Sequence, residues 1–181
     1  IETPAEKVLT AALEGAEAAL ADGFATLLEE QEAFWAEHWK LADVEIDGST
    51  WDQQMVRLSL FHLRQSLPAD GRRSIGANGL TGDKYCGHVF WDTEMYVSPY
   101  FLYTRPETVL PLVQYRYNLL DQARQRAREM QGVGALYSWN SISGEECGIV
   151  YEAATAEYHL LSAIAFAIYR YVRQTGDEAF L

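Results

Sequence analysis

The sequence is short of basic residues, has only two cysteines and lacks any long apolar run. Its 14 lysines and arginines are outnumbered by 26 aspartates and glutamates, which gives a formal net charge of −12. Such a chain lacks the basic surface that nucleic acid binding requires, and it is equally unsuited to an anionic lipid surface. No segment is apolar over the roughly 20 residues that a membrane-spanning helix needs. We therefore expect neither a nucleic acid nor a membrane as a partner.

The two cysteines and the absence of familiar catalytic motifs narrow the function further. Cys86 and Cys147 have no metal-binding spacing and are too few for a disulfide framework. We therefore expect free thiols, a cytoplasmic location and no metal site. The sequence contains no GxSxG, GxxxxGK[ST] or HExxH motif, and no GxGxxG motif after a strand. Nothing therefore indicates a serine hydrolase, a P-loop enzyme, a zincin or a Rossmann enzyme.

What the sequence does contain is apolar residues at helical spacing. The first stripe covers residues 8–35 and follows a capping box, Thr3–Glu6, with Pro4 at the first helical position. Gly23 is a candidate point of division into two helices. Residues 43–48 alternate like a short extended segment that ends in a turn.

Further helices are predicted from capping boxes and apolar stripes, and the fold class is therefore all-α. They are expected over about 50–67 (box Thr50–Gln53), 92–103, from the box Thr104–Glu107 onward, and 156–173. In the third of these, the inward residues are expected to be Val109, Leu112, Val113, Tyr117 and Leu120. Four basic residues follow late in that region, where they suit the helix dipole: Arg116, Arg124, Arg126 and Arg128.

Two glycine-bearing segments interrupt this pattern. Residues 69–90 contain five glycines, and residues 132–152 have no helical periodicity. Long ordered loops in compact domains are usually functional, so both are candidates for a site. At the end, Thr175–Glu178 forms another capping box, and residues 179–181 would be the first turn of a helix. A single turn is not stable alone, so we expect a piece of a longer protein.

The first candidate site is Trp91-Asp92, where the first loop meets a helix. An indole packs on the C–H face of a sugar, and a carboxylate accepts hydroxyl protons in charge-assisted bonds. A structural interpretation stays open beside this one. In it, Asp92 caps the helix, Glu94 faces the helix dipole and Trp91 fills the core.

The second candidate site is in the other loop, where Trp139 is followed by the adjacent acids Glu145 and Glu146. Two acids in a glycine-bearing loop suit sugar hydroxyls or acid–base chemistry. Alternatively, Ser143 and Glu146 would form a capping box if a helix began there. A weaker candidate is 157–159 (Glu-Tyr-His), for which dipole compensation and core packing are the favoured interpretation.

Taken together, the motifs resemble the signature of glycoside hydrolase family 65. The resemblance covers about residues 50–181, and residues 1–49 resemble more loosely the helical linker that precedes the catalytic barrel in that family. The matching motifs occur in the order that the family shows: Ser74-Ile75, Gly79-Leu80-Thr81-Gly82, Gly87-His88-Val89-Phe90-Trp91-Asp92-Thr93-Glu94, Pro99-Tyr100-Phe101, Tyr115-Arg116-Tyr117-Asn118, Gly144-Glu145-Glu146-Cys147, Ala154-Thr155-Ala156-Glu157-Tyr158-His159 and Thr175-Gly176-Asp177-Glu178.

The resemblance implies a fold and a reaction. The fold would be an (α/α)6 barrel, of which residues 50–181 would supply the N-terminal part and residues 1–49 the linker. The reaction would be inverting phosphorolysis of an α-linked glucose disaccharide, of maltose, trehalose or kojibiose type, to β-glucose 1-phosphate and a sugar. Inorganic phosphate would be the co-substrate, no cofactor would be needed, and the full-length protein would be a homodimer.

The resemblance also implies residue roles. Trp91 and Asp92 match the pair that holds the glucose unit at the bond being cleaved, and Trp139, Glu145 and Glu146 match a loop near the same cleft. No catalytic residue is expected here, because the general acid and the phosphate site lie farther along the family's chain. Asp83, Lys84 and Cys86 depart from the family pattern, which leaves the acceptor sugar open. A hydrolase like acid trehalase, or a non-catalytic helical module that binds sugar or a partner, are the alternatives.

Overall fold

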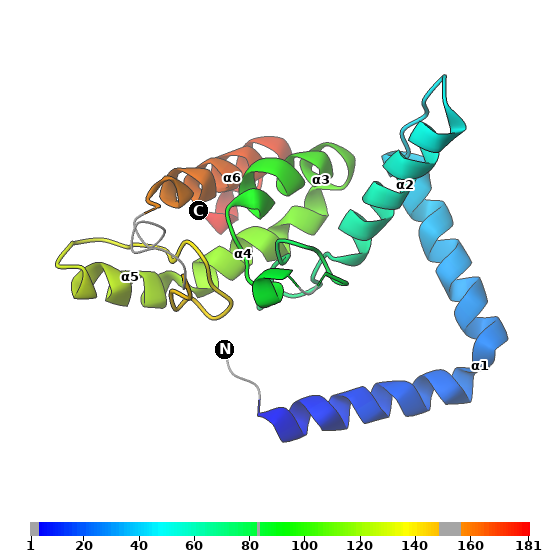
Figure 1. Cartoon of the computed structure of the whole chain (residues 1–181), viewed down its shortest axis with the longest axis horizontal. Helices are drawn as coiled ribbons and strands as arrows, with labels where there is room; N and C mark the ends of the chain where they lie inside the picture. The colour runs from blue at the N-terminus through cyan, green and yellow to red at the C-terminus, as the bar shows by residue number, and fades with distance from the viewer. Residues whose placement is uncertain (1–3, 83, 149–156) are drawn as a thin grey trace. The chain divides into compact units, whose positions relative to one another are not determined.

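The regular elements of the computed structural model are helical. The structure describes residues 4–82, 84–148 and 157–181, which fall into two compact units, Ile1–Asp47 and Gly48–Leu181. The described residues form six α-helices together with shorter 3-10 and π-helical turns (Figure 1). The only β-type pairing in these ranges is an isolated bridge between Val89 and Ser141. The predicted all-α class is therefore confirmed.

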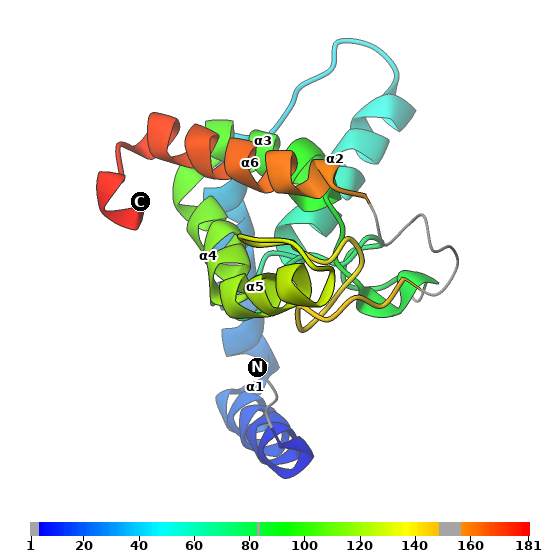
Figure 2. The ribbon, with the colours of Figure 1, turned by 90° about the vertical axis from the view of Figure 1, so that its left-hand side faces the viewer.

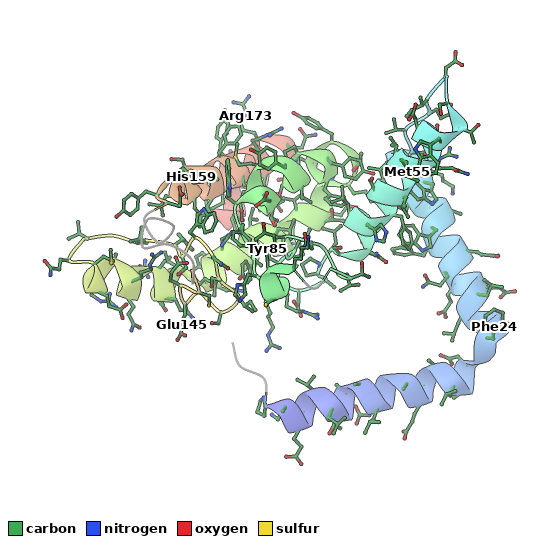
Figure 3. The ribbon with its side chains drawn as sticks, viewed as in Figure 1. Phe24, Met55, Tyr85, Glu145, His159 and Arg173 are labelled. Carbon is green, nitrogen blue, oxygen red and sulfur yellow. The ribbon has the colours of Figure 1, made fainter. Side chains whose placement is uncertain are left out.

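The first unit consists mainly of α1 (Ala5–Ala42). Its backbone leaves helical geometry at Gly23 (φ 76°, ψ 161°), so the expected division is confirmed at a residue that tolerates a positive φ. Pro4 precedes the helix as its cap rather than forming its first residue, and Thr3 of the predicted box lies outside the described residues. Phe24, which follows the division, is 80% exposed (Figure 3).

The second unit begins with α2 (Thr50–Gln65). Its cap is Ser49, whose hydroxyl accepts a bond from the Asp52 amide at 3.5 Å. The predicted box is therefore displaced by one residue, because a serine directly before Thr50 takes the capping position. The helix ends before Pro68, as expected.

The core of the second unit lies where α3 (Ser98–Thr104), α4 (Leu110–Asn118) and α6 (His159–Thr175) meet. Figure 2 shows α6 against α3 and α4. The buried side chains come from these helices and from the 3-10 turn Pro106–Val109: Phe101, Leu102, Val109, Val113, Ala167 and Tyr171. This core anchors the segments that enter α3 and leave α4.

Details of α4 and of its neighbour α5 (Leu120–Glu129) differ from the prediction. Thr104 is not a cap: it ends α3, and its hydroxyl bonds the Tyr100 carbonyl at 2.9 Å. Tyr117 was expected inward but is 59% exposed, whereas Tyr115 is 1% exposed. The inward face contains Tyr115 because its hydroxyl reaches the loop after α5.

The C-terminal helix ends in a left-handed glycine. Gly176 (φ 73°) closes α6, and residues Glu178–Phe180 form a 3-10 turn. Thr175 belongs to the last turn of α6, and its hydroxyl accepts from the Asp177 amide at 3.2 Å. The predicted box at 175–178 is therefore a helix end followed by a tight turn.

No helix within the described ranges is both long and apolar enough to cross a membrane.

Candidate sugar-binding site

The two predicted loops pair with each other. Within the described residues, the segments 69–90 and 132–148 contain only turns and one short 3-10 helix, Lys84–Gly87, as expected. Val89 and Ser141 exchange backbone hydrogen bonds of 2.9 and 3.3 Å. Beside this bridge, the Phe90 and Trp139 rings meet edge to face at 4.8 Å. The structure therefore brings the two candidate clusters together through their backbones and an aromatic contact.

Trp91 and Asp92 lie at the end of the first loop. The Trp91 ring is half-buried and packs edge-on against Tyr96 (5.4 Å) and His159 (4.6 Å). Asp92 is exposed and precedes the π-helical turn Thr93–Val97, but its carboxylate makes no capping bond. Among the described residues, no donor occupies this carboxylate. The capping alternative for Asp92 is therefore wrong.

A hollow of about 410 Å³ lies beside Asp92. It is formed by one face of α2, by residues 75–79 of the first loop and by the start of the π-helical turn. Its polar groups include His62 and Asn78, and most of the remaining lining is apolar. An apolar hollow with a few polar groups is typical of a small-molecule site.

Glu94 is paired with a buried arginine. Its carboxylate accepts two bonds from Arg116, Nε to Oε1 at 2.6 Å and Nη2 to Oε2 at 3.1 Å, and the two side chains are 5% and 2% exposed. Burial has the largest single effect and would lower the pKa of Arg116, but the charge and hydrogen bonds of Glu94, together with Tyr115 and Tyr137, raise the pKa of this guanidinium. Glu94 lies in the first turn of its helical segment and Arg116 in the last turn of α4, as the dipole interpretation expected, but the two side chains are also bonded to each other inside the core.

The Glu146 carboxylate organises the second loop. It accepts bonds from the backbone amides of Trp139 (2.8 Å), Asn140 (3.2 Å) and Gly148 (3.1 Å). Arg126 of α5 adds an ion pair of 3.0 Å. Four bonds fill the acceptor capacity of a carboxylate, so the geometry gives Glu146 the role of holding Trp139 in place. The predicted capping box at 143–146 is wrong, because no helix begins there.

Glu145, in contrast, is exposed beside a second hollow. This hollow has a volume of about 350 Å³ and lies between the second loop and the polar face of α5, including Gln122 and Glu129. Gly144 (φ 100°) makes the close approach possible, since a Cβ there would lie 3.0 Å from the Gln122 Cβ. The hollows beside Asp92 and Glu145 share no lining residue. The structure thus joins Trp139 to the first loop but places Asp92 and Glu145 in different hollows.

Two further residues belong to this region. The favoured core-packing interpretation of His159 is wrong: the side chain is 43% exposed, packs on Trp91 and pairs with Glu157 at 3.1 Å. Tyr115 was missed, and its hydroxyl donates to the Ile142 carbonyl at 2.6 Å. Its position beside Arg116 in the Tyr-Arg-Tyr-Asn motif was the only signal in the sequence. In the ranges that the structure describes, no group of three or more histidines, cysteines or acids could hold a metal ion.

Glu146→Gln tests the structural role of this carboxylate. An amide has one acceptor oxygen, and its NH2 group would face backbone donors, so at least one buried donor loses its partner. We expect the second loop to lose about 1–3 kcal/mol of local stability. Faster hydrogen exchange at Trp139 and Asn140, with unchanged exchange in α6, would show this. Unchanged exchange in the loop would contradict it.

Comparison with known proteins identifies the family. Residues 57–181 match the sequence profile of the "Glycosyl hydrolase family 65 central catalytic domain". The chain belongs to glycoside hydrolase family 65, and its fold is part of an (α/α)6 barrel, as the motifs predicted.

Several of its relatives are named as disaccharide phosphorylases. The chain is 50% identical to an alpha,alpha-trehalose phosphorylase of Thermoanaerobacter brockii over 97% of this chain and 23% of that protein. It is 39% identical to a kojibiose phosphorylase of Halothermothrix orenii, over 86% of this chain and 22% of that protein. A solved structure, a putative kojibiose phosphorylase from human microbiome, superposes with a TM-score of 0.88 at 33% identity, over 99% of this chain and 24% of that one. The chain thus spans about a quarter of the length of these relatives.

Proposed function

We propose that the full-length protein is an inverting disaccharide phosphorylase that cleaves an α-glucoside with inorganic phosphate to β-glucose 1-phosphate and a sugar. In this proposal, the described segment contributes glucose-binding residues, and the general acid and phosphate site lie elsewhere in the protein. The relatives named as trehalose and kojibiose phosphorylases support the reaction class. The linkage and the acceptor sugar are left open.

The observation that carries the glucose-binding role is the state of Trp91 and Asp92. The indole is half-buried and packs with His159 and Tyr96, and its exposed part is proposed to meet the C–H surface of a pyranose. The neighbouring carboxylate is exposed and makes no capping bond, so it can accept two sugar hydroxyls. An aromatic ring beside an exposed carboxylate suits a sugar, whose ring has apolar C–H faces and hydroxyl groups at its edges.

The residues of the second loop are proposed to have different roles. Glu145 is proposed to contact the substrate from the exposed side of its hollow, and Trp139 to border the glucose site through Phe90. Glu146 would act through Trp139, because its oxygens already accept four bonds. The absence of a cofactor, the homodimer and the cytoplasmic location stay predictions.

Phosphate dependence tests the reaction. Purified full-length protein is incubated with trehalose, kojibiose or maltose, with and without inorganic phosphate. We expect β-glucose 1-phosphate with phosphate and almost no cleavage without it, because phosphate replaces the water that an inverting hydrolase activates. Equal release of free glucose in both reactions would sink the proposal in favour of a family hydrolase. Sugar binding without any cleavage would favour a non-catalytic module.

A further inference from the structure

Stability alone does not explain the buried ion pair between Glu94 and Arg116. Replacing a buried ion pair by apolar side chains of similar size is often neutral or stabilising, because both charges must be desolvated. Yet both side chains here are almost fully buried and joined by two short bonds. Such a pair contributes fixed geometry, since a bidentate guanidinium accepts few alternative arrangements.

The bonds of Arg116 bracket the candidate sugar-binding pair. Its Nη2 atom donates to the Phe90 carbonyl at 3.1 Å, one residue before Trp91, and also to Glu94, two residues after Asp92. The guanidinium therefore holds the Phe90 backbone on one side of Trp91-Asp92 and the Glu94 side chain on the other. Arg116 lies in the last turn of α4, and this turn is itself held, because the Tyr137 hydroxyl donates to the Arg116 carbonyl at 3.0 Å.

The turn that carries Glu94 has an uncommon form. Residues Thr93–Val97 are π-helical, with the Ser98 amide bonded to the Thr93 carbonyl. π-Helical turns are rare and occur frequently at functional sites. The Thr93 hydroxyl also bonds the Ile75 carbonyl at 3.3 Å. The turn therefore directs Glu94 and Thr93 into the core while Asp92 stays exposed.

We propose that Arg116 and Glu94 are positioning residues for substrate binding: together they hold Trp91 and Asp92 in the arrangement that binds the glucose unit, without touching it. This inference rests on the proposed glucose-binding role of Trp91 and Asp92. It assigns a function to Arg116 within the Tyr-Arg-Tyr-Asn motif and to Glu94 at the end of the Trp-Asp-Thr-Glu motif.

The test is the double variant Glu94→Leu/Arg116→Met in the full-length protein. Both charges disappear together, so the fold should tolerate the change, but the Phe90 carbonyl loses its donor and the Trp91-Asp92 backbone can shift. A misplacement of about 1 Å can cost about 100-fold in rate. We expect kcat/KM to fall by about 10- to 100-fold and glucose affinity, measured by calorimetry without phosphate, to fall by about 10-fold, with an unchanged unfolding temperature.

The control is the exposed pair Asp121–Arg124 of α5, whose side chains are 90% and 53% exposed. Asp121→Asn/Arg124→Gln should leave affinity and rate unchanged. A folded Glu94→Leu/Arg116→Met protein with wild-type glucose affinity would overturn the inference. If that variant does not fold, Arg116→Lys decides: it keeps the charge but loses the forked geometry, and wild-type affinity there overturns the inference too. A wild-type protein that binds glucose but cleaves nothing refutes the phosphorylase proposal alone.

Discussion

Asp92→Asn in the full-length protein is expected to lower kcat/KM for the disaccharide by about 100-fold while leaving the unfolding temperature unchanged. Hydrogen bonds to a charged group contribute about 1.5–3 kcal/mol each, and each 1.4 kcal/mol is about tenfold in rate. Two sugar hydroxyls bound to the carboxylate would account for the expected loss. Stability should not change, because the Asp92 side chain makes no capping bond and asparagine caps helices as well as aspartate does.

The matched control for this substitution is Asp121→Asn, which changes another exposed aspartate near the start of a helix, in the first turn of α5. Steady-state kinetics and thermal unfolding are measured on both variants. The Asp121 variant should equal the wild type in both measurements. Wild-type kinetics for Asp92→Asn would show that the carboxylate does not bind substrate, and a lowered unfolding temperature would point to a structural role.

Arg116→Met alone is expected to destabilise the catalytic domain by about 3–5 kcal/mol, because it leaves the Glu94 carboxylate buried without its partner. Glu94 is 5% exposed, so water does not replace the lost guanidinium. Adding Glu94→Leu removes the orphan charge and should restore the stability of the wild type. Denaturant unfolding of the single and double variants measures the difference.

This pair of variants separates two explanations of the ion pair. A single variant as stable as the double one would mean that the orphan Glu94 is solvated by a local rearrangement. A double variant as unstable as the single one would mean that the loss comes from packing around Arg116, which is among the largest of the fully buried side chains.

Local patterns were sufficient for much of the fold. Apolar spacing located the helices, and Gly23 correctly marked the division of α1 because a positive φ is a property of the residue itself. The glycine-bearing segments were correctly predicted as loops, and the ordered motifs correctly indicated the family. Capping residues were less predictable: Ser49 and Thr50 are adjacent and both good caps, so the sequence pattern does not distinguish between them.

Contacts across distant segments could not be predicted. Glu94 and Arg116 are 22 residues apart, and each alone fits a conventional place near a helix end. Glu146 likewise looked like half of a capping box until the amides of Trp139, Asn140 and Gly148 converged on it. Sequence spacing carries no information on such convergence when a loop, rather than a helix, sets the geometry.

The bridge between Val89 and Ser141 has a consequence for exchanging segments among relatives. The two loops share backbone bonds and the contact between Phe90 and Trp139. A loop transplanted alone from a relative would therefore face a second loop whose backbone and side chains do not match it. Substitutions that retarget one loop are therefore conditional on the other. In a chimera with a relative of different linkage preference, residues 69–90 and 132–148 should both be taken from the same parent.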